Sequence, residues 1–176
     1  RRPRVVTRMP FERLVRAAGR GARVVRLWEC SSDPRKVGRF GVPCGWSATF
    51  TAGMHTVGGK ADCTMNGPRG EKAAGTWEFL EIDGPRAFTV LDSFADESGT
   101  PDPNLPSMRM SFVFEPTAEG TRMVTTSHFA SAEALETVVS MGAVEGTTMA
   151  MSQLDAVLQD LRDYAPGKGT NVELLD

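Results

Sequence analysis

Histidine and cysteine are scarce in this chain of 176 residues, which limits the metal and covalent chemistry open to it. His55 and His128 are the only histidines, so a three-histidine zinc site is excluded, and a mixed site would need a cysteine or carboxylate to join them. Cys30, Cys44 and Cys63 lie 14 and 19 residues apart, which fits neither a disulfide framework nor a Cys-x-x-Cys metal motif. We therefore expect free thiols, no metal and no cofactor.

Long apolar runs are absent as well. The longest extend over a few residues, whereas a helix that crosses a bilayer needs roughly 20. The chain does not open with a charged and then apolar signal-peptide pattern. We expect a cytoplasmic protein without membrane insertion, and the content of 40% hydrophobic and 24% charged residues is typical of one domain with its own core.

The near-neutral net charge of −2 hides an uneven distribution. Residues 1–40 hold twelve Arg or Lys and three acidic residues, a balance of +9, whereas residues 41–176 carry −11. A basic segment of this kind is either an arm for nucleic acid or an acidic partner, or a solvated helical face. We favour the solvated face, because no interleaved aromatics or zinc spacing accompany the arginines, and nucleic acid is not expected as a partner.

Alternation with a period of two predicts strands after Pro43, at residues 47–57, 60–66, 71–83, 87–94, 108–115 and 121–129. Glycine-rich turns separate several of them, and residues 95–106 predict an exposed loop. Ser131 is a natural N-cap for a long helix that runs to about Leu161 and contains Gly142 and Gly146.

The first forty residues give weaker patterns. Residues 4–8 predict a strand, residues 11–18 have helical spacing, and a second short helix is expected at about 22–29. Ser32 or Asp33 can cap a further helix that starts at Pro34.

Alternation also assigns the faces of the strands. Met108, Met110, Phe112 and Phe114 share one face, which we expect to point toward the long helix. A curved antiparallel sheet that grips a long helix tends to leave an apolar cavity between them. We expect the ligand-binding residues of this cavity to be Met65, Trp77, Phe79, Phe88, Val90, Asp92, Phe94, Met108, Met110, Phe112, Met123, Gly142, Glu145 and Met149.

Few of these residues can carry chemistry, and no catalytic residue is assigned. Asp92 shares its face with Phe88 and Val90, so it points into the cavity unless a bulge or the strand end turns it outward. Glu145 reaches either the cavity or a neighbouring backbone group. Cys63 and His55 form either a nucleophilic pair on adjacent strands or a small buried thiol beside a surface imidazole, and we favour the second alternative.

Four segments carry a resemblance to a known family: Val57 to Lys60, Met65 to Glu71, Gly75 to Pro85 and Met141 to Gly146. Taken together they resemble the SRPBCC superfamily (START-like, birch-pollen-allergen-like), in the bacterial branch related to the activator of the heat-shock-protein-90 ATPase. The resemblance covers residues 41–161 and implies an α+β helix-grip fold: a curved antiparallel β-sheet wrapped around a long C-terminal α-helix, with two short helices near the N-terminus. It also implies a hydrophobic pocket without a shared catalytic residue set.

These patterns divide the chain into a basic head at residues 1–40, a domain body at 41–163 and a flexible tail at 164–176. Three functions stay open: a carrier or sensor of a small hydrophobic ligand, a cyclase- or hydrolase-type enzyme that uses the same pocket, and a chaperone-interacting module. We favour the first. A homodimer is also left open.

Overall fold

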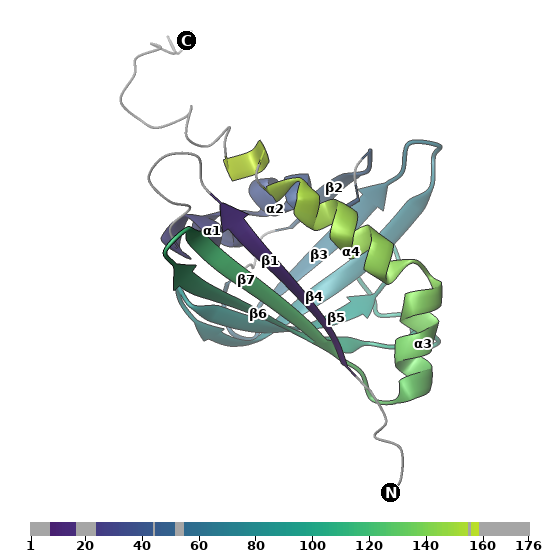
Figure 1. Cartoon of the computed structure of the whole chain (residues 1–176). Coiled ribbons are helices and arrows are strands. Elements are labelled where there is room, and N and C mark those ends of the chain that lie inside the picture. Colours follow the sequence, from purple (N-terminus) through teal and green to yellow (C-terminus); the bar gives the residue numbers. More distant parts are fainter. Residues whose placement is uncertain (1–7, 17–23, 44, 52–54, 155, 159–176) are drawn as a thin grey trace, which may run out of the picture.

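A curved antiparallel sheet forms the centre of the molecule, and helices cover its concave side (Figure 1). The computed structural model describes residues 8–16, 24–43, 45–51, 55–154 and 156–158. Within them the sheet has seven strands in the order β1-β7-β6-β5-β4-β3-β2. The strands are β1 (Arg8–Arg16), β2 (Ser47–Phe50), β3 (Lys60–Asn66), β4 (Lys72–Asp83), β5 (Ala87–Phe94), β6 (Met108–Thr117) and β7 (Gly120–His128). The helices are α1 (Val24–Ser32), α2 (Pro34–Phe40), α3 (Ala132–Ser140) and α4 (Ala143–Ser152).

This arrangement confirms the expected α+β class, and most strands lie where the alternation predicts them. β3 and β5 agree with the predicted bounds at both ends, and the other strands of the body after β2 differ by one or two residues at an end. β2 is the exception, because it ends at Phe50 instead of continuing to residue 57. His55 and Gly58 have φ values of 55° and 76°, and this left-handed backbone cannot continue a strand.

The helix expected at residues 11–18 is wrong, because residues 8–16 form β1. This strand pairs with β7 along its whole length, from Arg8 opposite His128 to Arg16 opposite Gly120. The pairing satisfies the backbone groups of β7 that would otherwise form a free sheet edge. A helix of eight residues is marginal on its own, so this tertiary pairing overrides the local spacing. The strand expected at 4–8 falls largely outside the described residues.

The two short helices near the N-terminus are present. α1 begins at Val24, close to the predicted start, and α2 follows after Asp33. The Asp33 carboxylate accepts a hydrogen bond of 3.0 Å from the backbone N–H of Arg35 and caps α2 as expected. Ser131 caps α3 in the same way, with its hydroxyl 3.2 Å from the N–H of Ala134.

The C-terminal helical segment is interrupted, although the sequence predicts one continuous helix. α3 ends at Ser140, and α4 starts after Gly142, whose φ of 85° lies in the left-handed region. A side chain added at Gly142 would meet nothing within 4 Å, so the glycine serves the backbone turn and not a close approach to the sheet. α4 then crosses the concave face obliquely, and α3 lies at one end of the sheet (Figure 1).

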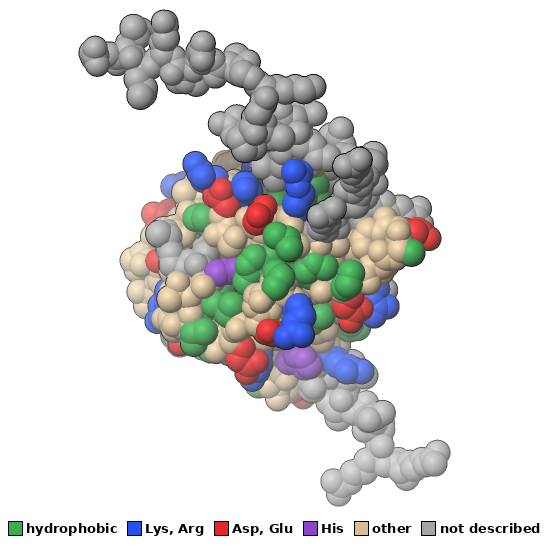
Figure 2. All heavy atoms as spheres, turned by 90° about the vertical axis from the view of Figure 1, so that its left-hand side faces the viewer, with side chains coloured by type: hydrophobic (Ala, Val, Ile, Leu, Met, Phe, Trp, Pro, Cys, Tyr) green, Lys and Arg blue, Asp and Glu red, His purple; other side chains and the backbone are tan. Residues whose placement is uncertain are grey.

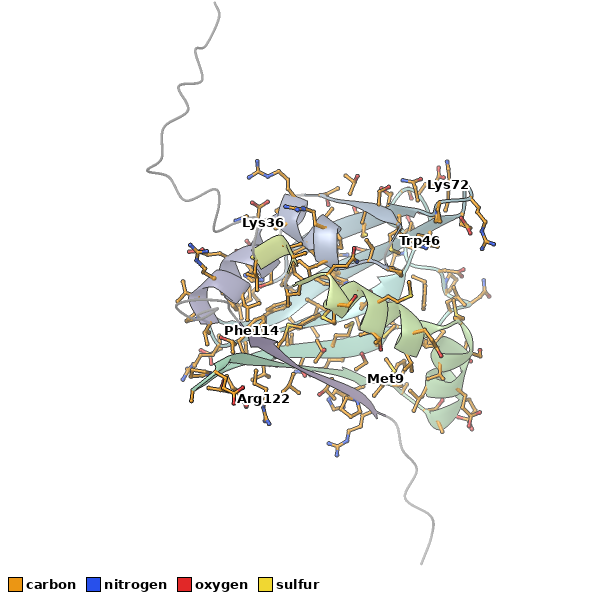
Figure 3. All side chains as sticks on the ribbon, turned by 45° about the horizontal axis from the view of Figure 1, so that its top comes forward. Met9, Lys36, Trp46, Lys72, Phe114 and Arg122 are labelled. Atoms are coloured by element: carbon orange, nitrogen blue, oxygen red, sulfur yellow. The ribbon has the colours of Figure 1, made fainter. Side chains whose placement is uncertain are left out.

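The core fills the space between the concave face and the helices, as Figure 3 shows for the side chains beneath α4. Its largest cluster joins α1, α2, the sheet and the end of α4, and a smaller one under α3 contains Met108, Phe129 and Val138.

Hydrophobic side chains also gather on the face that looks left in Figure 1, with charged groups around them (Figure 2). The homodimer stays a prediction. None of the described helices has the length and apolar content needed to cross a bilayer.

Replacement of the two glycines of the C-terminal segment by alanine should change the free energy of unfolding in opposite directions. Gly142→Ala should lower the free energy of unfolding by about 1 kcal/mol, because alanine disfavours the left-handed backbone. Gly146→Ala should raise it by up to about 1 kcal/mol, because the residue is helical and its new Cβ would lie 3.7 Å from Pro43, an ordinary contact. Chemical denaturation of both variants checks this, and equal effects would contradict the assigned roles.

Candidate functional site

A cavity of about 370 Å³ lies between the concave face of the sheet and the helices. Its floor comes from the inward-facing residues of the strands, and its roof comes from α4, α2 and the segment after α2. In α4, Gly146 and Ala150 lie four residues apart on the helix side that faces the sheet, and Leu154 continues this line just beyond the helix. The wall is largely made of methionine, aromatic and small aliphatic residues, and within the described part of the chain Asp92 is its only carboxylate.

Nine of the fourteen residues expected to contact a ligand line this cavity. Their contact with a ligand stays a prediction. They are Met65, Trp77, Phe88, Asp92, Phe94, Met108, Met110, Phe112 and Met123.

The structure places the other five elsewhere. Phe79 and Val90 have no exposed surface and lie within the core. Gly142, Glu145 and Met149 are exposed, because the break at Gly142 sets the rotation of α4 and turns these positions to solvent. Glu145 therefore does not reach the cavity.

Several wall residues were missed by sequence reasoning. One group comes from α1, α2 and the segment after α2, in or next to the first forty residues, where the sequence patterns are weakest. These residues are Leu27, Ser31, Val37, Phe40, Gly41, Pro43 and Trp46. Thr125 and Ser127 were missed because they are polar, although alternation along β7 places them on the same face as Met123. The Thr125 hydroxyl is buried and makes no hydrogen bond within the described structure.

Asp92 points into the cavity, as one of the two alternatives predicts. It lies between Trp77 on β4 and Met108 on β6 in the register of the sheet. Desolvation raises the pKa of its carboxyl group to about 6, against a smaller lowering effect of a hydrogen bond from the Trp77 side chain. Part of its surface remains accessible because it faces the cavity. Asp92 is therefore a carboxyl group that changes charge near neutral pH within an apolar enclosure.

Cys63 lies in the same part of the wall and is not an activated nucleophile. Burial raises the pKa of its thiol to about 12, and the nearby charge of Asp92 contributes in the same direction. A reactive cysteine requires the opposite shift. The described ring contacts of His55 are with Trp28, Phe79 and Phe88, and none of its described contacts involves Cys63. Cys30 is a buried free thiol as well.

His55 is half-buried in an aromatic cluster, so the expectation of a surface imidazole is wrong. Its ring centre lies 4.3 Å from that of Trp28 and 4.7 Å from that of Phe88. Neither ring nitrogen has a hydrogen-bond partner in the described structure, and burial lowers the pKa of His55 to about 4. Among the described residues, no three His, Cys, Asp or Glu side chains are close enough together to hold a metal ion.

Comparison with known proteins identifies the family to which this fold and cavity belong. A family model described as "Activator of Hsp90 ATPase homolog 1-like protein" matches residues 22–159. The chain belongs to this family. The predicted SRPBCC superfamily and its branch are thereby confirmed.

Solved structures of bacterial proteins agree with this assignment. Protein Ms6760 from Mycobacterium smegmatis is 36% identical, with 86% of this chain and 90% of that chain covered and a TM-score of 0.76. A protein from Arthrobacter aurescens is 35% identical, with coverages of 94% and 93% and a TM-score of 0.78. Protein NE0264 from Nitrosomonas europaea is 21% identical, with coverages of 90% and 97% and a TM-score of 0.74. At this identity the similarity supports the fold alone. A search of curated proteins found no match.

Membership in the activator-like family accounts for the helix-grip architecture but does not identify a ligand. Asp92 and His55 have shifted pKa values of about 6 and about 4, and each predicts an effect of pH on stability.

The Asp92→Asn variant should be more stable than the unchanged protein at about pH 8 by roughly 1–3 kcal/mol, and equal to it at about pH 4. The folded-state pKa of about 6 exceeds the unfolded value, so the stability that Asp92 contributes is complete below pH 4 and is lost as the pH rises through 6. Asparagine removes the ionised form and still accepts the bond from Trp77. Urea denaturation of both proteins at the two pH values measures this. If Asp92→Asn differs from the unchanged protein by the same amount at both, ionisation of Asp92 does not destabilise the fold and the prediction is wrong.

The His55→Phe variant should show the opposite pH response. The folded-state pKa of about 4 lies below the unfolded value, so the contribution of His55 is present above about pH 6.5 and is lost as the pH falls toward 4. Phenylalanine keeps a ring against Trp28 and Phe88 and does not titrate. Relative to the unchanged protein, the variant should gain roughly 1–3 kcal/mol more at pH 4 than at pH 7.5. Denaturation curves of both proteins at the two pH values measure this. If the stability difference between the variant and the unchanged protein is the same at both pH values, the prediction is wrong.

Proposed function

We propose that this protein binds a small, largely apolar molecule in the cavity between the sheet and α4. The observation that carries this proposal is a cavity of about 370 Å³ with an apolar wall. Protein interiors are close-packed, and voids much larger than a water molecule are few. The volume also falls within the range of small-molecule sites.

The composition of the wall supports an occupant that is held by shape more than by polar contacts. Met65, Met108, Met110 and Met123 contribute flexible thioether side chains from three strands, β3, β6 and β7. Methionine adapts its rotamers to different apolar shapes and packs well against aromatic rings such as Phe112. Such a wall suits a carrier or sensor.

An enzyme that uses the same cavity is the second candidate, and Asp92 favours it. A carboxyl group with a pKa of about 6 is suited to accept and return a proton near neutral pH. In that case Asp92→Asn would retain substrate binding and lose turnover, whereas a carrier would show no turnover to lose.

A chaperone-interacting module is the third candidate, suggested by the family description. This function would use the outer surface of the protein. Variants of the cavity that keep the fold should then leave chaperone binding unchanged.

A variant that fills the cavity tests the proposed function. Ala150 lines the cavity from α4 and is buried, so Ala150→Leu should extend a larger side chain into the space. The uncharged dye phenylnaphthylamine should bind the unchanged protein with increased fluorescence, and Ala150→Leu should weaken that binding at least about tenfold while the thermal unfolding midpoint stays equal or rises.

Thr148→Leu is the matched control, because Thr148 lies on the same helix and is exposed. It adds a similar side chain outside the cavity and should leave dye affinity unchanged. Absence of dye binding to the unchanged protein, or equal affinities for the two variants, would overturn the proposal. Met110→Glu should abolish binding and also lower stability, because it buries a charge in the wall.

A further inference from the structure

We propose that the molecule bound in the cavity carries a protonated amine, and that this ammonium group pairs with the Asp92 carboxylate. This inference rests on the proposed function and specifies the chemistry of its ligand. The expected occupant is a compact hydrophobic cation: an apolar or aromatic body with one amine at the end that lies against β4 and β5.

The first argument is charge. Asp92 is the only carboxylate among the described residues of the wall, and in this part of the chain it forms no ion pair. The Trp77 side chain supplies one hydrogen bond, whereas a carboxylate has about four acceptor positions. Buried charges in proteins are normally paired, because an isolated one loses its hydration without compensation. The partner of Asp92 is therefore expected to come with the ligand.

The second argument is the space beside Asp92. The neighbouring inward position on β4 is Gly75, and it lies opposite Phe94 on β5 and Cys63 on β3. All of these residues line the cavity. Gly75 adds no side chain there, and a Cβ at this position would lie only 3.2 Å from the Ser93 carbonyl oxygen. A ligand group can therefore reach the carboxylate from the cavity side.

The third argument is the aromatic surroundings. Trp77 and Phe94 both line the cavity, and Trp77 packs edge-on against Phe50 with ring centres 5.6 Å apart. Aromatic faces attract organic cations, and a carboxylate combined with aromatic rings is a common arrangement for binding an amine in a site that excludes water. A ligand carboxylate would be repelled by Asp92, and a hydroxyl group would leave its charge uncompensated.

Asp92 should be the only group on the described wall whose charge state controls this binding. Cys63 on β3 is the other titratable group on the described wall, and its thiol, with a pKa of about 12, stays neutral at physiological pH. Trp77 on β4 and Met108 on β6 do not titrate, and the described wall residues of α4 carry no ionisable group. His55 packs behind Phe88 and does not line the cavity.

A set of matched probes tests the inference with the full chain. Naphthylmethylamine, naphthylmethanol and naphthoate share one aromatic body and differ in the charge of the attached group. By isothermal titration calorimetry at about pH 7.5, the amine should bind at least about tenfold more tightly than the alcohol, and naphthoate should bind most weakly. At about pH 4.5, where Asp92 is protonated, the advantage of the amine over the alcohol should largely disappear.

Two variants assign the preference to Asp92. Asp92→Asn should reduce amine affinity to that of the alcohol and leave alcohol binding within about twofold. Glu78→Gln is the matched control, because it removes a carboxylate from the adjacent strand, where the Glu78 side chain is 42% exposed and pairs with Lys60. That control should keep the preference for the amine.

The possible outcomes distinguish the pairing of an ammonium group with Asp92 from the proposed binding of an apolar molecule. If the alcohol binds the unchanged protein as tightly as the amine, or if the amine preference survives Asp92→Asn, the ammonium partner is overturned while apolar binding stands. If none of the three probes nor the uncharged dye binds, the proposed function itself is overturned.

Discussion

The packing of aromatic rings around Phe88 is the interaction on which the rest of the structure depends. Phe88 stacks on Phe112 of the next strand, with ring centres 4.5 Å apart and planes 13° from parallel. Its ring also contacts Trp28 of α1 at 6.0 Å and His55 at 4.7 Å. The cluster therefore holds α1 against the sheet and, through Phe88 and Phe112, forms part of the cavity floor. Because these rings fill one part of the concave face, the remaining space is left to the more adaptable methionines.

His55 belongs to this cluster and Asp92 lies further along β5, and their effects on stability run against each other. As the pH rises from 4 to 6, the Asp92 carboxyl ionises in the unfolded chain but stays largely protonated in the fold, which lowers stability. Over the same interval His55 is neutral in the fold and loses its proton in the unfolded chain, which raises stability. The two contributions have opposite signs, so they partly offset each other in the unchanged protein. The dependence becomes visible when one of the two groups is removed.

The sheet could be predicted from the sequence because its faces follow a local rule. Alternation along β5 and β6 places Asp92 and Met110 on the inward face, and that rule needs no knowledge of the partner strands. The hydrogen bond from Trp77 to Asp92 could not be predicted in the same way, since it depends on the register between β4 and β5 and on the bulge after Phe79. β1 was missed because its stability comes from pairing with a strand more than a hundred residues away.

The helical side of the cavity was harder to predict for a different reason. Gly142 and Gly146 look equivalent in the sequence, yet the first ends one helix segment in a left-handed conformation and the second lies inside the next segment. This break decides which residues of α4 face the sheet, and it turns Glu145 to solvent. The consequence for function is direct: with Glu145 outside, Asp92 is the carboxylate that the described wall retains. A single charged group on the described wall, beside a thiol that stays neutral, favours recognition of a charged ligand over proton transfer between two protein groups.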